Sequence, residues 1–195
     1  MITGFLKKIL LMLVLATVAT TVSAQWQLNN AESSIDYVSI KKSKAGELNT
    51  FGKLKGVIEQ NGKATVIISL ASVETKIPVR NERMQSMLFE IDRFPEATVS
   101  TVVEYGRIEG MKLGDSFVQP AKLKLSLHGE EQEIETELRV VRLGEGRLLV
   151  STIRPVIVNA EKFSLGKGVE KLREIAKLPS ISSAVPVTVD LLFEK

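Results

Sequence analysis

Residues 121–140 read AKLKLSLHGEEQEIETELRV, and this stretch decides the fold class. In its first half every second residue, from Ala121 to Leu127, is apolar, while the residues between them are polar. The second half repeats the alternation from Ile134 to Val140, with glutamates and an arginine in between. A period of two is typical of β-strands with one buried and one solvated face. We therefore predict an antiparallel hairpin.

The turn of this hairpin is predicted at Gly129-Glu130, because glycine readily adopts the positive φ of a type II′ turn. Such a turn fixes the register, and charge and apolarity favour the same one. The predicted pairs are Lys124 with Glu135 and Lys122 with Glu137 on the wet face, and Leu125 with Ile134 and Ala121 with Leu138 on the dry face.

Further strands are predicted on both sides of this hairpin. Residues 46–59 and 63–73 flank Asn61-Gly62, and a three-residue loop with a left-handed Gly62 would pair Leu54 with Ile68. Residues 147–158 are apolar on both faces, and residues 185–193 alternate as a final half-buried strand.

Two segments have helical spacing instead. Residues 80–89 carry Met84, Met87 and Leu88 at this spacing, and residues 168–178 carry an apolar stripe that ends before Pro179. About eight strands with inward aliphatic residues and two short helices fit an all-β barrel or sandwich, and a closed barrel leaves no sheet edge exposed.

Composition narrows the function classes. The 195 residues are 44% hydrophobic and include no cysteine and one histidine, which excludes disulfides, cysteine nucleophiles and Cys/His zinc sites. Lys7 and Lys8 lie in the N-terminal leader, so the formal charge of +3 falls to about +1 for the rest. A nearly neutral body does not fit a nucleic-acid-binding protein.

The first 24 residues are typical of a cleaved signal peptide. Two lysines precede the apolar run ILLMLVLA at 9–16, and the segment ends in small residues at Val22 and Ala24. The apolar run is too short for a spanning helix, which needs about 20 residues. We expect cleavage before Gln25, export to a bacterial periplasm, and one domain over residues 25–195.

Several short motifs of residues 25–195, taken in order, resemble the YceI family of lipocalin-like periplasmic proteins associated with polyisoprenoid binding. The resemblance rests on Trp26-Gln27-Leu28, Ser34-Ile35-Asp36-Tyr37, Ser72-Val73-Glu74-Thr75, Arg80-Asn81, Phe89, Phe94-Pro95 and Leu125-Ser126-Leu127-His128-Gly129. The chain departs from the family after the first strand, where Ser39, Ile40 and Lys41 replace a frequent histidine.

The resemblance implies an eight-stranded antiparallel lipocalin-like barrel with two short helices and an apolar cavity. An isoprenoid lipid or a quinone would be the ligand, no cofactor is required, and a membrane would serve only as the lipid source. The tunnel wall is assigned to the inward rows Leu54, Ile68, Leu123, Leu125, Leu127, Ile134, Leu138, Val140, Val187, Val189 and Leu191. Small inward residues favour space inside the barrel: Gly56, Ala64, Ala121, Thr136 and Thr152.

Three arginines are candidates for the lipid head group. Arg80 and Arg83 lie near the start of the first helical segment, where they would receive a phosphate or quinone head. Arg154 is in phase with Val150 and Val156, and an inward guanidinium would need an acidic partner or an anionic head. Helix capping for the first two, and an outward orientation for Arg154, are the competing interpretations.

Catalysis is not indicated. His128 is expected to be a surface residue beside the turn, with no serine and acid placed to form a triad. The row of Glu133, Glu135 and Glu137 faces lysines and is interpreted as solvated surface rather than a metal site. We therefore predict a non-enzymatic lipid carrier. The alternative is a barrel with a filled core that acts through its surface in the cell envelope; oligomeric state is left open.

Overall fold

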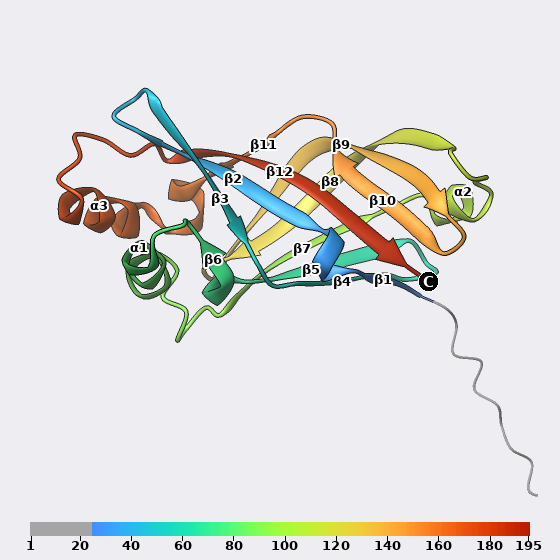
Figure 1. The fold of residues 1–195 in the computed structure, drawn as a ribbon, viewed down its shortest axis with the longest axis horizontal. Helices are drawn as coiled ribbons and strands as arrows, with labels where there is room; N and C mark the ends of the chain where they lie inside the picture. The colour runs from blue at the N-terminus through green and yellow to red at the C-terminus, as the bar shows by residue number, and fades with distance from the viewer. Residues whose placement is uncertain (1–24) are drawn as a thin grey trace, which may run out of the picture.

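A computed structural model describes residues 25–195, and the predicted signal peptide lies outside the described residues. Eight long strands form a closed antiparallel barrel, as predicted, with one of them bent at Gly52-Lys53 into two segments (Figure 1). The wall consists, in chain order, of β2 (Ser34–Lys41), β3 (Ala45–Phe51), β4 (Leu54–Ile58), β5 (Lys63–Ser69), β7 (Glu96–Val102), β8 (Ser116–Leu127), β9 (Glu130–Gly144), β10 (Arg147–Thr152) and β12 (Ala184–Glu194).

Short elements complete the barrel. Strand β1 (Trp26–Leu28) pairs with both β12 and β4, β6 (Val73–Glu74) pairs antiparallel with the end of β3, and β11 (Val156–Asn159) pairs with β12. The helical elements are η1 (Asn30–Glu32), η2 (Leu70–Ser72), α1 (Pro78–Arg83), the π-helical turn η3 (Met84–Leu88), α2 (Tyr105–Glu109), η4 (Ala160–Phe163) and α3 (Gly166–Ile175).

The central hairpin forms with the predicted faces but a different turn. His128 and Gly129 are the turn residues, with φ of 53° and 82°, and positive φ at both positions is the type I′ pattern rather than II′. The ladder therefore pairs Lys124 with Glu133 and Ala121 with Thr136. The predicted register was wrong by two residues. A shift of two keeps every side chain on its face, so the inward row was assigned correctly.

The second predicted hairpin forms with the predicted turn and register, although its second strand ends at Ser69 rather than at residue 73. Leu54 pairs with Ile68, Glu59 donates its backbone N–H to the Lys63 carbonyl, and Gly62 has a φ of 85°. A side chain at Gly62 would collide with the Val103 carbonyl, so both its conformation and its surroundings require glycine.

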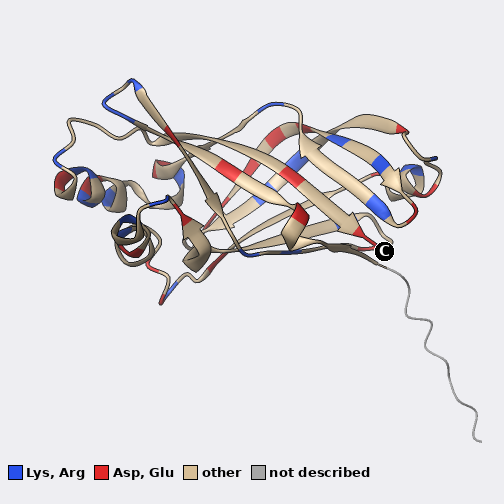
Figure 2. Cartoon of the chain, viewed as in Figure 1, with Lys and Arg blue, Asp and Glu red and all other residues tan. Residues whose placement is uncertain are grey.

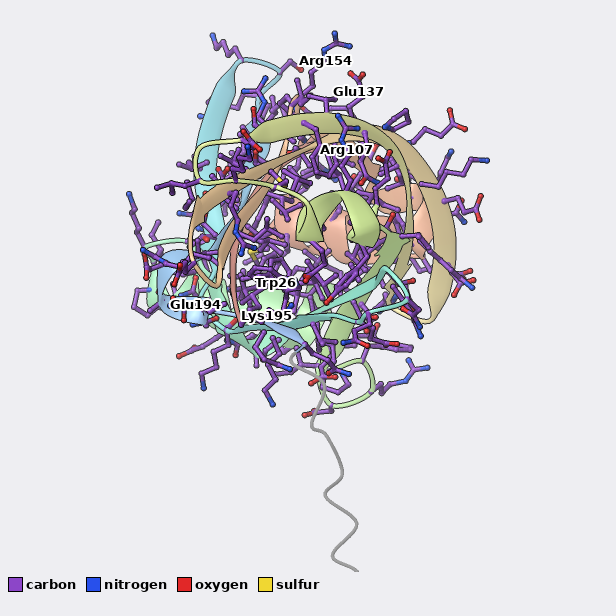
Figure 3. All side chains as sticks on the ribbon, turned by 90° about the vertical axis from the view of Figure 1, so that its right-hand side faces the viewer. Trp26, Arg107, Glu137, Arg154, Glu194 and Lys195 are labelled. Atoms are coloured by element: carbon purple, nitrogen blue, oxygen red, sulfur yellow. The ribbon has the colours of Figure 1, made fainter. Side chains whose placement is uncertain are left out.

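The helices gather at the two ends of the barrel. Helix α1, η3 and α3 lie at one end beside the β2–β3 hairpin tip, whereas α2 crosses the other end (Figures 1 and 3). The first predicted helix corresponds to α1 and η3 together, with Pro78 in its first turn. Helix α3 corresponds to the second, and α2 was not predicted. No described helix is long and apolar enough to cross a membrane.

Candidate functional site

The barrel encloses an apolar cavity of about 340 Å³. Its lining includes nine of the predicted wall residues: Ile68, Leu123, Leu125, Leu127, Ile134, Leu138, Val187, Val189 and Leu191. The other two, Leu54 and Val140, are buried in the core but do not line the cavity. Of the small residues, Ala64 and Thr152 line it. The interior is therefore not a filled core.

One end of the cavity is closed by tightly packed side chains. Trp26, Ile108 and Leu148 have no exposed surface, and Phe193 is almost as deeply buried. The guanidinium of Arg142 lies 4.9 Å from the Trp26 ring centroid, a cation–π contact that covers the indole. Figure 3 views this end, where α2 crosses the barrel above Trp26 and Lys195. A ligand therefore has no path through this end.

The opposite end, which we call the mouth, opens between α1, α3 and the β2–β3 hairpin. The apolar stripe of α3 explains why it stays open: Val169 and Leu172 are half-buried, while Ile175 and Ala176 line the cavity and are exposed. Gly168 packs α3 directly against η3, since a Cβ there would stand 2.7 Å from the Met87 carbonyl oxygen. The stripe thus faces the cavity entrance rather than a packed core.

Polar groups of the cavity lining gather at the mouth around Glu47 of β3. Its carboxylate accepts a hydrogen bond from Lys41 Nζ at 2.5 Å and pairs with the Arg80 guanidinium. Arg80 also donates to the Thr75 hydroxyl and carbonyl, at 3.0 and 2.9 Å. Asn81 in turn accepts hydrogen bonds from the Thr75 hydroxyl and backbone N–H. This network fixes Arg80 at the edge of the apolar cavity.

The charges of this network are mutually stabilised. The hydrogen bond from Lys41 lowers the pKa of the Glu47 carboxyl below its usual 4.5, and Arg80 acts in the same direction. Deeper inside, burial raises the pKa of Tyr37 far above its usual 10.0, so its phenol is neutral. The phenol oxygen lies 3.7 Å from the Met84 sulfur. The cavity is thus apolar inside and cationic only at its mouth.

The three arginines predicted to bind the head group do not lie at one site. Arg80 and Arg83 both line the mouth, and Arg83 forms no ion pair within residues 25–195. Arg154 is exposed and projects from the outer surface (Figure 3), so the outward alternative is confirmed and the head-group assignment of this arginine was wrong. The predicted strand 147–158 breaks at Ile153–Pro155, and the break interrupts the alternation from which the orientation of Arg154 was inferred.

His128 is more buried than predicted. Its side chain is 10% exposed and packs against Phe94 with the ring planes tilted and the ring centroids 4.4 Å apart, while Nε2 lies 3.9 Å from a Glu90 oxygen. The segment before β7 covers the turn, which sequence alternation could not indicate. The interpretation of His128 as a surface residue was therefore wrong. Its described contacts with Phe94 and Glu90 include no nucleophile, so they do not indicate a catalytic base.

The glutamate row lies on the outer face of β9, as predicted. Glu133, Glu135 and Glu137 are exposed, and Lys122 lies 3.8 Å from Glu135. Within residues 25–195 no group of three or more acidic or histidine side chains is arranged to hold a metal ion.

The sequence-based prediction missed Lys41, Glu47 and Thr75. These residues come together through the pairing of β2 with β3 and of β3 with β6. The one available signal was the family-type motif Ser72-Val73-Glu74-Thr75 followed by Arg80-Asn81, which lies in the network.

A closed eight-stranded antiparallel barrel around an apolar cavity, with one cationic mouth, places this protein in the lipocalin-like class. Comparison of sequences then gives the family. The YceI-like domain profile matches residues 26–193, and the chain belongs to this family.

Solved structures agree with this assignment. A polyisoprenoid-binding domain from Saccharophagus degradans, implicated in plant cell wall breakdown, is 37% identical, with a TM-score of 0.85; the match covers 87% of this chain and 97% of that one. Burkholderia cenocepacia BcnA is 16% identical, with a TM-score of 0.65 and coverage of 85% and 98%. The Campylobacter jejuni YceI protein is 15% identical, with a TM-score of 0.54 and coverage of 75% and 84%. These two show the fold alone. No curated protein matches the chain.

Proposed function

We propose that this protein is an exported carrier of a long isoprenoid-type lipid, with the chain inside the barrel and the head group at the mouth. The observation that carries the proposal is the apolar cavity with its single polar, cationic end. A lipid chain buried there is removed from water along its whole length, which stabilises the bound state by about 0.8 kcal/mol per CH₂-sized group. The 37% identical polyisoprenoid-binding domain supports the same ligand class.

The mouth supplies direction rather than most of the affinity. Arg80 is held by Glu47 and Thr75, so it forms a fixed positive edge, whereas Arg83 remains free to meet an anionic head. A charge-assisted hydrogen bond contributes about 1.5–3 kcal/mol. We expect a phosphate-headed isoprenoid to bind at least about tenfold more tightly than its uncharged alcohol.

The direct test is mass spectrometry of organic extracts from protein purified out of its own host. An isoprenoid lipid at near-stoichiometric amount is the expected result. An extract without lipid, from a protein with an intact fold by circular dichroism, would refute the carrier.

The head-group assignment has a separate test with a conservative variant. Arg83→Gln should weaken binding of a phosphate-headed isoprenoid by about tenfold and leave the uncharged alcohol unaffected. Equal losses for both ligands would show that Arg83 acts on the chain or the fold instead. Arg154→Gln is the matched control, since this arginine is exposed away from the cavity.

Export is part of the proposal because residues 1–24 have the sequence pattern of a signal peptide. N-terminal sequencing of the periplasmic fraction should begin at Gln25. A chain that keeps Met1 in the cytoplasmic fraction would contradict it.

A further inference from the structure

The charges of the described chain are separated along the barrel. Three mouth segments, residues 41–47, 74–83 and 166–178, carry ten basic and five acidic residues, whereas the rest of residues 25–195 carries 14 basic and 18 acidic. The mouth segments therefore have a net charge of +5 and the remainder −4. Figure 2 shows the lysines and arginines of the hairpin tip, α1 and α3 at this end.

Much of this charge is available to a partner. Lys42, Lys44 and Lys76 are exposed and form no ion pair within residues 25–195. By contrast, Lys122 and Lys124 on the barrel wall each face a glutamate, the latter at 2.8 Å. The positive charge of the mouth is thus not neutralised by the protein's own carboxylates.

Apolar side chains protrude among these lysines. Ile77 and Val79 are 45% and 47% exposed on either side of the exposed Pro78, and Ile175 is 42% exposed at the end of α3. Ile175 also lines the cavity, so the exposed apolar surface continues into the interior. A basic surface with protruding apolar side chains matches the chemistry of an anionic bilayer surface: phosphate outside, acyl chains beneath.

We propose that the mouth segments dock on an anionic lipid bilayer, with the three lysines among the head groups and Ile77, Val79 and Ile175 at the level of the first acyl carbons. The inference rests on the proposed carrier function. A lipid that leaves a bilayer through water exposes its apolar chain, whereas a docked mouth provides a continuous apolar path. An acidic protein would match the positive charge equally well, but the exposed apolar side chains and their continuity with the cavity favour a bilayer.

The first experiment measures docking without any isoprenoid. Lipid-stripped protein is sedimented with vesicles of phosphatidylcholine alone or with about 30% phosphatidylglycerol, at about 0.05 and about 0.5 M salt. Binding should require phosphatidylglycerol and fall with salt. The variant K42Q/K44Q/K76Q should bind about a hundredfold more weakly, at about fivefold per charge. The matched control, with the same loss of charge on exposed lysines outside the mouth segments, is K55Q/K63Q/K112Q.

Three results would overturn the proposal: equal binding to both vesicle types, equal losses in the two triple variants, or no sedimentation with either vesicle. If the protein binds an acidic protein through the mouth segments but does not sediment with either vesicle, the surface would be assigned to that class of protein instead. Because the vesicles contain no isoprenoid, these results are independent of the extraction test. A carrier that retains its lipid but does not dock refutes only the docking surface.

A second experiment reads the orientation. The chain has one tryptophan, Trp26, which is fully buried at the closed end. Val79→Trp would add a second at the mouth. Vesicles with brominated acyl chains should quench the added indole and leave the wild-type fluorescence unchanged. Quenching of wild-type Trp26, or no quenching in the variant under conditions where it sediments, would contradict docking through the mouth.

Discussion

Leu125→Trp distinguishes a lipid cavity from a packed core. Leu125 is 8% exposed, lines the cavity and lies opposite Val99 across the β7–β8 ladder. An indole at this position enters the cavity instead of displacing packed neighbours. We expect a change in the free energy of unfolding within about 1.5 kcal/mol, the range for tolerated apolar replacements.

The same ring should remove lipid. It would occupy the space of about one five-carbon unit, whose burial contributes on the order of 2–4 kcal/mol before ordering costs. A loss of about 2 kcal/mol is about a thirtyfold weaker affinity. Lipid retention, measured by mass spectrometry of extracts, should therefore fall sharply while the melting temperature moves by only a few degrees.

Leu54→Trp is the matched control, because Leu54 is equally buried but does not line the cavity. Overpacking there should cost about 1–3 kcal/mol. If Leu125→Trp destabilises the protein as much as Leu54→Trp, the interior is packed and the reasoning fails. Full lipid retention with unchanged stability would place Leu125 outside the ligand path.

Three further results are expected. Glu47→Gln should lower the free energy of unfolding near pH 7 by about 0.5 kcal/mol. Because the pKa of Glu47 is lowered in the folded state, this difference should be complete above pH 4.5 and vanish as the pH falls through the lowered pKa. Denaturant titrations at several pH values measure the difference, and a difference that grew in acid would contradict the prediction. Gly168→Ala should cost about 1–3 kcal/mol in thermal unfolding, because its Cβ would meet the backbone of Met87 and Leu88; an unchanged melting temperature would show that α3 moves freely. His128→Ala should cost about 1 kcal/mol through the lost Phe94 contact and leave lipid content unchanged, whereas lost lipid with an intact fold would revive a chemical role.

The barrel wall could be predicted because it depends on a local pattern. Alternation along β8 and β9 assigns Leu123, Leu125 and Ile134 to one face whatever the register, and that face lines the cavity. The register itself depended on which two residues form the turn. His128 adopts the left-handed conformation that the prediction reserved for glycine. The turn therefore lies one residue earlier than predicted, and the observed register differs from the predicted one by two residues.

The mouth could be predicted only in part, because it is assembled from distant segments. Arg80 was identified, but its partner Glu47 lies 33 residues away and reaches it through the β3–β6 pairing. Arg154 was misplaced for the opposite reason. A local pattern was extended past Thr152, where β10 ends, and across Pro155 into β11. Helix α2 has only five residues, which is too few for a helical period to show.

Both ends of the described chain lie at the closed end, where Gln27 of β1 pairs with Glu194 of β12. A tag or surface linker attached after Lys195 therefore leaves the entrance facing solution, which suits immobilised binding assays. The neighbouring ends also allow a circular permutant, in which a short linker joins Lys195 to Gln25 and new ends open at the β2–β3 tip near Ser43. Such a permutant would keep every wall strand and cut only the loop beside the mouth. It would therefore show whether binding depends on that loop or on the barrel alone.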